Sequence, residues 1–237
     1  MKQSAPHRMK SAIIIFPGTN RDSDMVMALE KVSGKTPHKV WYNEKDLPDA
    51  DLYVLAGGFA YGDYLRAGAM AARAPVIRAL ADQASKGAAV LGVCNGFQIL
   101  TEIGLLPGAL MRNSKLKFIC RNLDVRVDET GSIFTKKYQP GQKLSFPVAH
   151  NDGNYFADAA TLDQLEEQNR IAFRYVNATG TIEPDGNPNG SVGNIAGILN
   201  KEKNVLGLMP HPENATDSKL GGTDGYALFQ SIVENLS

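Results

Sequence analysis

The residues best suited to chemistry surround Cys94, which lies in the motif Gly92-Val-Cys-Asn-Gly96. An apolar run at residues 88–93 precedes the motif, and a helical spacing of apolar residues follows it from Phe97. The motif matches the G-x-S-x-G turn of hydrolases with cysteine for serine, where small neighbours permit a strained strand-to-helix turn. A thiol at a helix N-terminus gains reactivity from the helix dipole and free amides. We therefore predict a nucleophilic Cys94; the alternative is a buried structural cysteine.

Two backbone stretches are suited to bind negative charge. The amide of Asn95 directly follows Cys94 and could help to hold an oxyanion. Gly57 and Gly58 follow the strand predicted at residues 52–55, and the lack of a Cβ lets backbone amides there approach a ligand closely. Both stretches can therefore present amides to a substrate.

A cysteine nucleophile needs a base and usually a third group that orients the base. Of the four histidines, His211 and His150 are the candidates, because each ends a predicted strand. Each has a carboxylate two residues later, Glu213 or Asp152, and in an extended segment such positions share a face. Spacing alone does not decide between the two pairs, and a hydrogen-bonded strand end without a catalytic role is the alternative for each histidine.

Composition favours a single-domain enzyme. The 237 residues are 43% hydrophobic, enough to bury the core of one α/β domain. Lys plus Arg equals Asp plus Glu at 25 each, which leaves no basic surplus for nucleic acid or a membrane surface. Two cysteines, Cys94 and Cys120, cannot form a disulfide framework or a zinc cluster and fit a reducing compartment. We expect Cys120 to pack within a strand.

The N-terminal residues do not resemble a targeting signal. Residues 1–10 are polar and charged without an apolar core, so they do not form a secretory signal, and no later stretch is long enough to span a bilayer. We expect a cytoplasmic protein with a disordered extension at residues 1–10 and a single domain at residues 11–237, because Met9 stands just ahead of the first predicted strand.

Strand and helix patterns alternate through the first half of the chain. Continuous apolar runs at residues 12–16, 52–55 and 88–93 predict strands covered on both faces. Their alternation with helices predicts a mainly parallel sheet with right-handed crossovers. The second half has shorter strand patterns between turn-rich loops, so we expect antiparallel additions there. The remaining predicted elements are helices at residues 22–33, 67–86 with an interruption near Pro75, 97–106 and 224–235 and strands at residues 38–42, 118–127, 144–150, 171–175, 195–199 and 205–209.

Four stretches together resemble one protein family. They are Gly57-Gly-Phe-Ala-Tyr-Gly-Asp-Tyr-Leu-Arg-Ala-Gly68, Gly92-Val-Cys-Asn-Gly-Phe-Gln-Ile-Leu100, Pro147-Val-Ala-His150 with Asp152-Gly-Asn154, and Gly207-Leu-Met-Pro-His-Pro-Glu213. The cysteine motif resembles that of class I, triad-type glutamine amidotransferases, and the first stretch is similar to the narrower group of glutaminase subunits of phosphoribosylformylglycinamidine synthase. The resemblance runs from Ser11 to the C-terminus. It implies a flavodoxin-like, three-layer α/β sandwich with a mainly parallel central sheet.

The resemblance also implies a catalytic triad. Cys94 would attack the side-chain amide of glutamine, His211 would be the base, and Glu213 would orient the base. His150 would then have a structural role or contact a partner.

The resemblance further implies which groups bind the substrate. The amides of Gly58 and Asn95 correspond to the oxyanion hole, with Phe59 as the alternative first donor. Gln98 matches a glutamine-binding position of related amidotransferases.

The resemblance also implies that the overall reaction is divided between separate subunits. A γ-glutamyl thioester would form, ammonia would leave, and water would release glutamate. The ammonia would pass to a separate large synthetase subunit that converts formylglycinamide ribonucleotide to formylglycinamidine ribonucleotide in de novo purine biosynthesis, and a small third subunit would bridge the two. ATP and Mg²⁺ would belong to the synthetase, and this chain would hold neither cofactor nor metal.

Two positions depart from the pattern of the family. Arg21 stands where many members carry cysteine, and Asn151-Asp152 stands where many carry Gly-Glu; both concern contacts to glutamine or to a partner rather than the implied triad. Two other functions compete: a cysteine hydrolase or related amidotransferase on the same scaffold, and a non-catalytic binding subunit. Glutamine-dependent release of glutamate and ammonia would distinguish the first, and the intact triad argues against the second.

Overall fold

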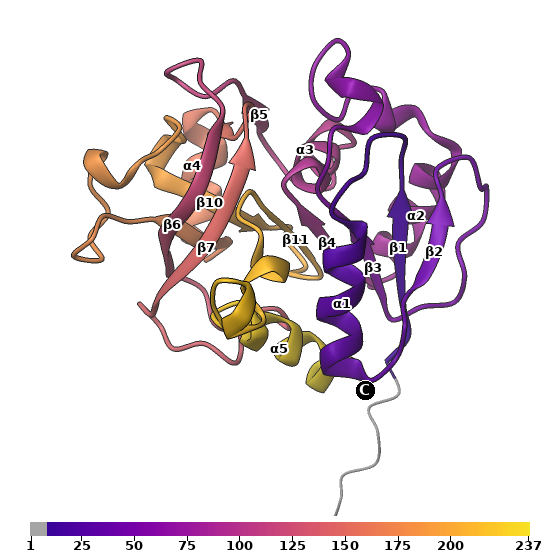
Figure 1. The fold of residues 1–237 in the computed structure, drawn as a ribbon. Coiled ribbons are helices and arrows are strands. Elements are labelled where there is room, and N and C mark those ends of the chain that lie inside the picture. The colour runs from indigo at the N-terminus through magenta and orange to yellow at the C-terminus, as the bar shows by residue number, and fades with distance from the viewer. Residues whose placement is uncertain (1–8) are drawn as a thin grey trace, which may run out of the picture.

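The structure is a computed structural model that describes residues 9–237. Its strands are β1 (Ser11–Ile15), β2 (His38–Trp41), β3 (Leu52–Leu55), β4 (Ala89–Val93), β5 (Ala109–Met111), β6 (Ile119–Val127), β7 (Lys143–His150), β8 (Asn154–Phe156), β9 (Ile171–Tyr175), β10 (Ile195–Leu199) and β11 (Val205–Leu208). Within the described residues one nine-stranded sheet has the strand order β2-β1-β3-β4-β11-β10-β9-β6-β7, and β5 pairs with β8 separately (Figure 1).

Helices cover both faces of the parallel half of this sheet, which consists of β2, β1, β3, β4 and β11. The α-helices are α1 (Asp22–Ser33), α2 (Pro75–Ser85), α3 (Asn95–Glu102), α4 (Ala159–Glu167) and α5 (Tyr226–Leu236). The crossovers from β1 to β2 and from β3 to β4 run in opposite directions along the sheet. Because such crossovers are right-handed, they place α1 and α2 on opposite faces. Helix α5 lies beside α1, and α3 follows β4 on the other face (Figure 1). The expected three-layer α/β architecture is confirmed.

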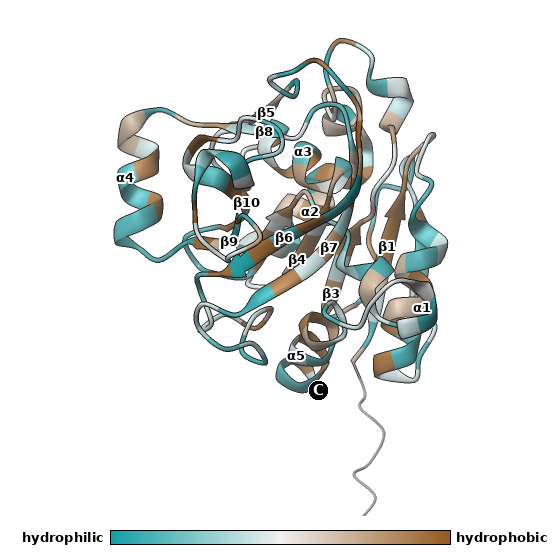
Figure 2. Ribbon diagram, turned by 60° about the vertical axis from the view of Figure 1, so that its left-hand side comes forward, coloured by the Kyte–Doolittle hydropathy of each residue, from teal (hydrophilic) through white to brown (hydrophobic). Residues whose placement is uncertain are grey.

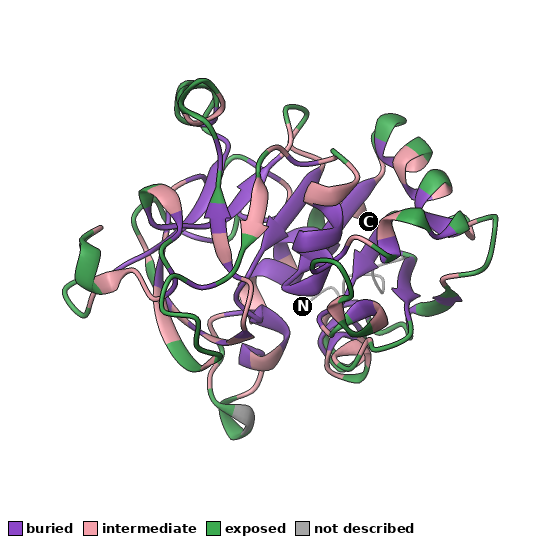
Figure 3. Ribbon diagram, turned by 90° about the horizontal axis from the view of Figure 1, so that it is seen from above, coloured by how far each residue is buried: buried purple, intermediate pink, exposed green. Residues whose placement is uncertain are grey.

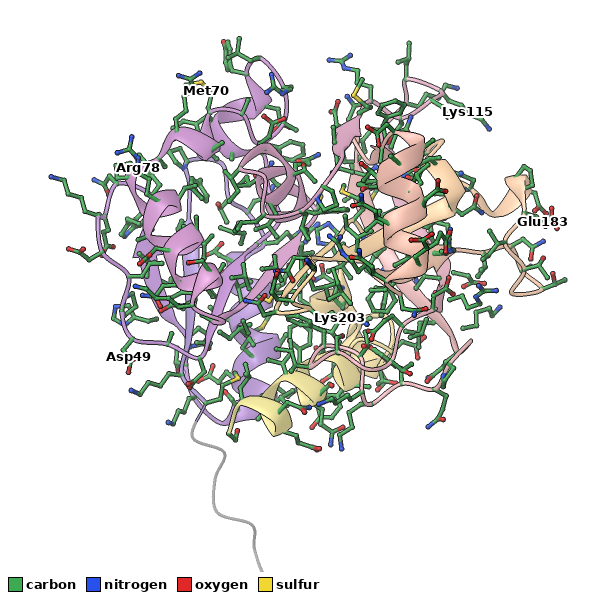
Figure 4. The ribbon with its side chains drawn as sticks, turned by 180° about the vertical axis from the view of Figure 1, so that it is seen from behind. Asp49, Met70, Arg78, Lys115, Glu183 and Lys203 are labelled. Atoms are coloured by element: carbon green, nitrogen blue, oxygen red, sulfur yellow. The ribbon has the colours of Figure 1, made fainter. Side chains whose placement is uncertain are left out.

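The other half of the sheet is antiparallel, as the turn-rich second half of the sequence predicted. Strands β11, β10, β9, β6 and β7 alternate in direction, and β6 pairs with β7 from Ile119 opposite His150 to Arg126 opposite Lys143. The loops that carry Met70 and Lys115 are well separated in the sequence, yet they stand at the same end of the molecule (Figure 4). Residues far apart in sequence can therefore meet at this end of the sheet.

The core occupies the centre of the sheet. Every residue of β1, β3, β4 and β11 is buried, as predicted for strands that are covered on both faces. These strands form the hydrophobic centre in Figure 2 and the buried centre in Figure 3. Because strand interiors have no access to solvent, substrate chemistry is confined to the ends of the strands and the loops that follow them. None of the described helices is long and apolar enough to cross a membrane.

The helix predicted over residues 67–86 is wrong in its first half. Helix α2 begins only at Pro75, because Ala74 has an extended ψ of 144°, as is usual for the residue before proline. Gly68 ends the preceding loop with a φ of 82°, and a Cβ there would lie 2.9 Å from the backbone of Gln98. The loop is therefore pressed against α3 instead of forming a helix of its own. The short helix α4 was not predicted, although Asp158 is a typical N-cap residue and accepts from Thr161 N at 2.8 Å.

The predicted N-terminal extension lies mostly outside the described residues, because residues 1–8 are not described. Met9 and Lys10, which were expected to belong to it, are part of the fold. Met9 is buried in the core, with 1% of its surface exposed, and the Lys10 carbonyl accepts from the Asp51 amide at 2.9 Å. The ordered chain therefore begins at least two residues before Ser11.

Candidate active site

Cys94 occupies the sharp turn between β4 and α3. Its φ of 52° and ψ of −106° lie in a region that residues with side chains seldom adopt. The Cys94 amide donates to Leu208 O of β11 at 2.8 Å, which continues the sheet, whereas its carbonyl accepts from Gln98 N at 3.2 Å, which belongs to the helix. The residue is thus shared between strand and helix, and its thiol stands at the N-terminus of α3 at the carboxyl end of a central strand.

Glycines provide the space for this turn and for the imidazole beside it. A Cβ on Gly96 would lie 2.0 Å from Leu55 O of β3, and a Cβ on Gly92 would lie 2.8 Å from Gly96 O. A Cβ on Gly57 would lie 2.7 Å from Cε1 of His211. The expectation that the motif glycines serve close packing is confirmed.

His211 follows β11 and is held by its backbone and its side chain. Its amide donates to Pro147 O of β7 at 2.8 Å, and its Nδ1 lies 2.7 Å from Oε1 of Glu213. The side chains of His211 and Glu213 are 3% and 0% exposed. The backbone between them is not extended, as the spacing argument assumed, because a short 3₁₀ helix, Pro212–Ala215, begins directly after His211. The two side chains meet across this turn.

The surroundings of His211 favour its charged form. Burial by itself lowers the pKa of His211, because the imidazolium loses hydration. The negative charges of Glu213 and Cys94 outweigh burial and raise this pKa above its ordinary value. The Nε2 atom of His211 has no hydrogen-bond partner among the described residues, and Cys94 and His211 line the same pocket. The pair is arranged for proton exchange between thiol and imidazole.

The competing histidine, His150, is not paired with Asp152. Its Nδ1 lies 3.1 Å from Oδ1 of Asn113, while Asp152 faces Arg112 at 3.8 Å. Burial, together with the charge of His211, lowers the pKa of His150 to about 4. His150 is therefore neutral at neutral pH. Spacing allowed two contacts between a histidine and a carboxylate, and among the described residues the structure forms only the one between His211 and Glu213.

Two backbone amides near Cys94 are free to bind a ligand. The amides of Gly58 and Asn95 donate to no acceptor among the described residues. The amide of Phe59, the alternative donor, is engaged with Gly18 O at 2.9 Å. Oδ1 of Asn95 accepts from Ala60 N at 3.1 Å, so the glycine loop is tied to the start of α3.

Gln98 is 5% exposed, and both ends of its amide contact the protein. Its Oε1 accepts from Asn95 Nδ2 at 2.9 Å, and its Nε2 donates to Asp152 O at 2.7 Å. Gln98 does not line the pocket at Cys94. It joins the start of α3 to the loop that follows β7.

A pocket of about 160 Å³ opens at Cys94 and His211, and Gly58 lines it as well. Five further residues of its wall were not predicted as site residues. Asn20 and Arg21 lie in the loop after β1, and Arg21 stood out only as a departure from the family pattern. The others reach the pocket because the β6–β7 hairpin folds back to the end of β4, a pairing that leaves no local signal in the sequence. Cys120 is exposed rather than packed within the core, which corrects the expectation for this residue. The five are Asn20, Arg21, Phe118, Cys120 and Ala149.

Comparisons with known proteins agree with this geometry. The family model of the CobB/CobQ-like glutamine amidotransferase domain matches residues 8–220. The chain is 59% identical over 230 residues to phosphoribosylformylglycinamidine synthase subunit PurQ of Rhodospirillum rubrum, covering 97% of this chain and 100% of that relative. It is 57% identical over 225 residues to the subunit of the same name from Mesorhizobium japonicum, covering 95% and 98%.

Solved structures extend the comparison. A chain in the structure of PurLQS from Thermotoga maritima is 40% identical, with a TM-score of 0.85 and coverage of 97% of this chain and 99% of that chain. A glutamine amidotransferase from the same organism is 14% identical, with a TM-score of 0.61 and coverage of 97% and 98%, and shares the fold alone.

A cysteine raised on a strained turn at the carboxyl end of a central strand, in a chain that the family model spans almost throughout, defines a glutamine amidotransferase. Within this class, identities of 57% and 59% over nearly the full chain narrow the assignment. The chain belongs to the PurQ family, the glutaminase subunits of phosphoribosylformylglycinamidine synthase. The resemblance seen in four short stretches of sequence is thereby confirmed.

Proposed function

We propose that the chain releases ammonia from glutamine with Cys94 as nucleophile, His211 as base and Glu213 as the group that orients the base. The observation that carries the proposal is the 2.7 Å contact between His211 Nδ1 and buried Glu213, next to a thiol on a strained turn. A carboxylate at Nδ1 fixes the tautomer and stabilises the imidazolium, and Nε2 is left to exchange a proton with the thiol.

The proposed reaction has two halves. The sulfur of Cys94 attacks the carboxamide carbon of glutamine, and the amides of Gly58 and Asn95 stabilise the oxyanion. His211 then donates its proton to the departing nitrogen, so that ammonia leaves and the γ-glutamyl thioester remains. Water attacks the thioester with His211 as base, which releases glutamate and restores the thiol. The engagement of the Phe59 amide with Gly18 O at 2.9 Å supports Gly58 as the first donor.

Gln98 is the residue proposed to help seat glutamine, and it would act mainly through the loop after β7, because both ends of its amide are engaged by the protein. It follows Cys94 by one turn of α3, and its Nε2 holds the carbonyl of Asp152 at 2.7 Å. Through this bond Gln98 also fixes the loop after β7. Side chain and loop would together seat the substrate.

The chain is a glutaminase subunit that serves the synthesis of formylglycinamidine ribonucleotide in purine biosynthesis. The relative from Thermotoga maritima was solved as PurLQS, which supports assembly with the other subunits of the synthase. In the proposed complex the large subunit uses ATP and Mg²⁺ to add the ammonia to formylglycinamide ribonucleotide, a small subunit bridges the two, and the assembly works in the cytoplasm. Residues 11–237 would act as a single glutaminase domain without a cofactor of its own, because the triad uses only side chains and water.

Reconstitution with the cognate synthetase tests this function. The wild-type chain should support product formation from glutamine. Cys94→Ala should abolish it but leave product formation from added ammonia intact, because the synthetase chemistry lies in another subunit. Loss of both activities in a fully assembled complex would contradict the division of labour. Glutamine-dependent product with Cys94→Ala would show that another residue is the nucleophile.

A further inference from the structure

The thiol of Cys120 faces the same pocket as Cys94. Cys120 is exposed, and both cysteines of the chain line the pocket of about 160 Å³ at His211. Phe118, two residues before Cys120, also lines this pocket, whereas Ile119 between them does not. Because successive side chains of a strand point to opposite faces, the thiol of Cys120 lies on the face that borders the pocket.

The pairing of β6 with β7 places Cys120 close to the surroundings of Cys94. Cys120 is directly opposite Ala149 in the ladder, so their two side chains share a face of the sheet. The carbonyl oxygen of Ala149 lies 3.8 Å from Cys94 Sγ. Ala149 is therefore the link between the two cysteines, and a group bonded to the sulfur of Cys120 lies over the pocket at Cys94.

A second cavity adjoins Cys120 and is lined by positive charge. Its volume is about 360 Å³, and Lys115, Lys117 and Arg121 belong to its wall together with Cys120. None of the described acidic residues lines this cavity. The side chains of the three cations form no ion pair or hydrogen bond with any described residue. A hollow with charge of one sign attracts a ligand of the opposite sign, so this one favours an anion.

We propose that Cys120 is a modification site that forms a mixed disulfide with a small anionic thiol, a peptide thiol with more carboxylates than ammonium groups. Cys120 lines both cavities. Its sulfur can therefore be bonded to the thiol half of the ligand while the carboxylates of the ligand lie among Lys115, Lys117 and Arg121. The thiol and the cations together select this class of ligand over neutral or cationic thiols.

The adduct closes the pocket at Cys94. Nε2 of His211, whose side chain is 3% exposed, has no hydrogen-bond partner among the described residues and belongs to a residue of this pocket wall. The pocket is therefore built to receive a polar ligand. With a peptide thiol on Cys120, glutamine loses access to Cys94. This consequence rests on the proposed glutaminase function, whereas the modification itself does not.

The modification exchanges one disulfide bond for another. The thiolate of Cys120 attacks one sulfur of the oxidised small thiol, the disulfide bond of that reagent breaks, and the departing half leaves as a thiolate that takes a proton. The number of disulfide bonds stays the same, and an excess of free thiol reverses the exchange. Because Cys94 is only 5% exposed and access limits such exchange, Cys120 reacts first.

Incubation of the full-length chain with glutathione disulfide tests the proposal, with peptide mass mapping to locate the adduct. We expect the adduct on Cys120 and, once it has formed, alkylation of Cys94 by iodoacetamide at least about tenfold slower than before, because the thiolate is no longer accessible. Dithiothreitol should restore the original rate. The matched control is Cys120→Ser, in which the same incubation should leave the alkylation rate of Cys94 unchanged.

The charge of the reagent distinguishes a binding site from a merely accessible cysteine. Cystamine is a small disulfide with a cationic group on each half, and each reagent is compared with itself in the wild type and in the double variant Lys115→Gln, Lys117→Gln. The ratio of the glutathione disulfide rate to the cystamine rate at Cys120 should fall about tenfold in the variant, since several exposed charge pairs change together. In the wild type the ratio should also fall with added salt.

A cysteine without a binding site around it predicts different results. Absence of an adduct on Cys120, an adduct that leaves the alkylation of Cys94 unchanged, or a rate ratio that is equal in wild type and variant would each overturn the proposal. A disulfide between Cys94 and Cys120 in place of the adduct would overturn it as well. These readouts need no glutamine, so failure of the glutaminase proposal appears in the reconstitution assay and failure of this one appears in the mass map and the rates.

Discussion

Two buried histidines in electrostatic contact have opposite preferences for charge. His211 faces Glu213 at 2.7 Å, and the carboxylate raises its pKa against the effect of burial. Among the described residues, the ring of His150 has a hydrogen-bond contact only with the side-chain amide of Asn113. Burial together with the charge of His211 lowers the pKa of His150 to about 4. One imidazole is therefore suited to carry a proton during the reaction, and the other is suited to remain a neutral acceptor.

This difference predicts the order in which variants lose reactivity. His211→Ala should lower the rate at which a glutamine-analogue electrophile labels Cys94 by orders of magnitude, because a nucleophile and its base act as a unit. Glu213→Ala should cost less, since the carboxylate acts through the imidazole. His150→Ala should retain labelling within about tenfold of the wild type, the effect of one lost hydrogen bond. Labelling rates of folded proteins at one pH provide the measurement. If His150→Ala blocks labelling and His211→Ala does not, the pair of His150 and Asp152 replaces the proposed triad.

His150 should also make stability depend on pH. Its pKa is near 6.5 in the unfolded chain and about 4 in the folded one. The unfolded state therefore binds the proton first as the pH falls through this window, and stability is lost. At about 1.4 kcal/mol per unit the total is about 3 kcal/mol.

Urea unfolding of the wild type and His150→Asn measures this effect. The asparagine amide can replace Nδ1 but does not titrate, so the advantage of the wild type should shrink by about 3 kcal/mol between pH 6.5 and pH 4. Asp63, whose pKa burial and the charge of Asp152 raise to about 6, acts with the opposite sign but is present in both proteins and cancels in the difference. A difference that does not change with pH would contradict the prediction.

At the scale of elements, the active site depends on how closely α3 approaches β3. Gly96 lies in the first turn of α3, and a Cβ there would be 2.0 Å from the backbone oxygen of Leu55. A backbone atom in a central strand cannot move aside as a flexible side chain can. The position of Cys94 is therefore coupled to the packing of a helix against the sheet.

Gly96→Ala should consequently reduce both stability and activity. We expect a loss of at least about 1–3 kcal/mol, as for overpacking of a core, and a slower alkylation of Cys94 because the turn is displaced. Gly104→Ala is the control, since Gly104 follows α3 with a φ of 74° but has open space around it. It should cost about 1 kcal/mol of backbone strain and leave Cys94 reactive. Thermal or urea unfolding and the alkylation rate check both variants, and an unaffected Gly96→Ala would contradict the packing argument.

At the scale of the whole molecule, the loop after Gly58 differs from the core in its strained backbone and in its exposed apolar side chains. Tyr61, Asp63 and Leu65 have positive φ values of 55°, 55° and 69°. Tyr64 and Leu65 are 76% and 85% exposed. A strained loop with exposed apolar side chains beside the amide proposed to bind the oxyanion is suited to be ordered by another subunit.

We therefore expect the isolated chain to be a poor glutaminase and to become faster on complex formation. The physical reason is that the amide of Gly58 must point at the oxyanion, and a partner that packs on the loop can hold it in that orientation. Glutamate release with and without the synthetase, at equal concentrations of this chain, measures the effect. Equal turnover in both states would refute this explanation.

Local patterns in the sequence determined much of the fold and the strained turn that carries Cys94, the proposed nucleophile. The continuous apolar runs of β1, β3 and β4 are buried on both faces as predicted, because a strand between two layers of helices is stabilised by apolar side chains on both faces. Cys94 between Gly92 and Gly96 was predictable for a similar reason, since a strained turn needs small neighbours at fixed spacing. Such signals are short-range, and a few adjacent residues contain them completely.

Only the tertiary structure decided which distant groups meet at the sulfur. His211 with Glu213 and His150 with Asp152 have identical spacing, and the turn at Pro212 brings the first pair together while Asn113 takes the ring of His150. Cys120 and Ala149 reach the pocket at Cys94 from strands of the antiparallel half. These contacts arise from the order of strands in the sheet and from the fold of the β6–β7 hairpin, which are set by the burial of many side chains at once rather than by any short stretch of sequence.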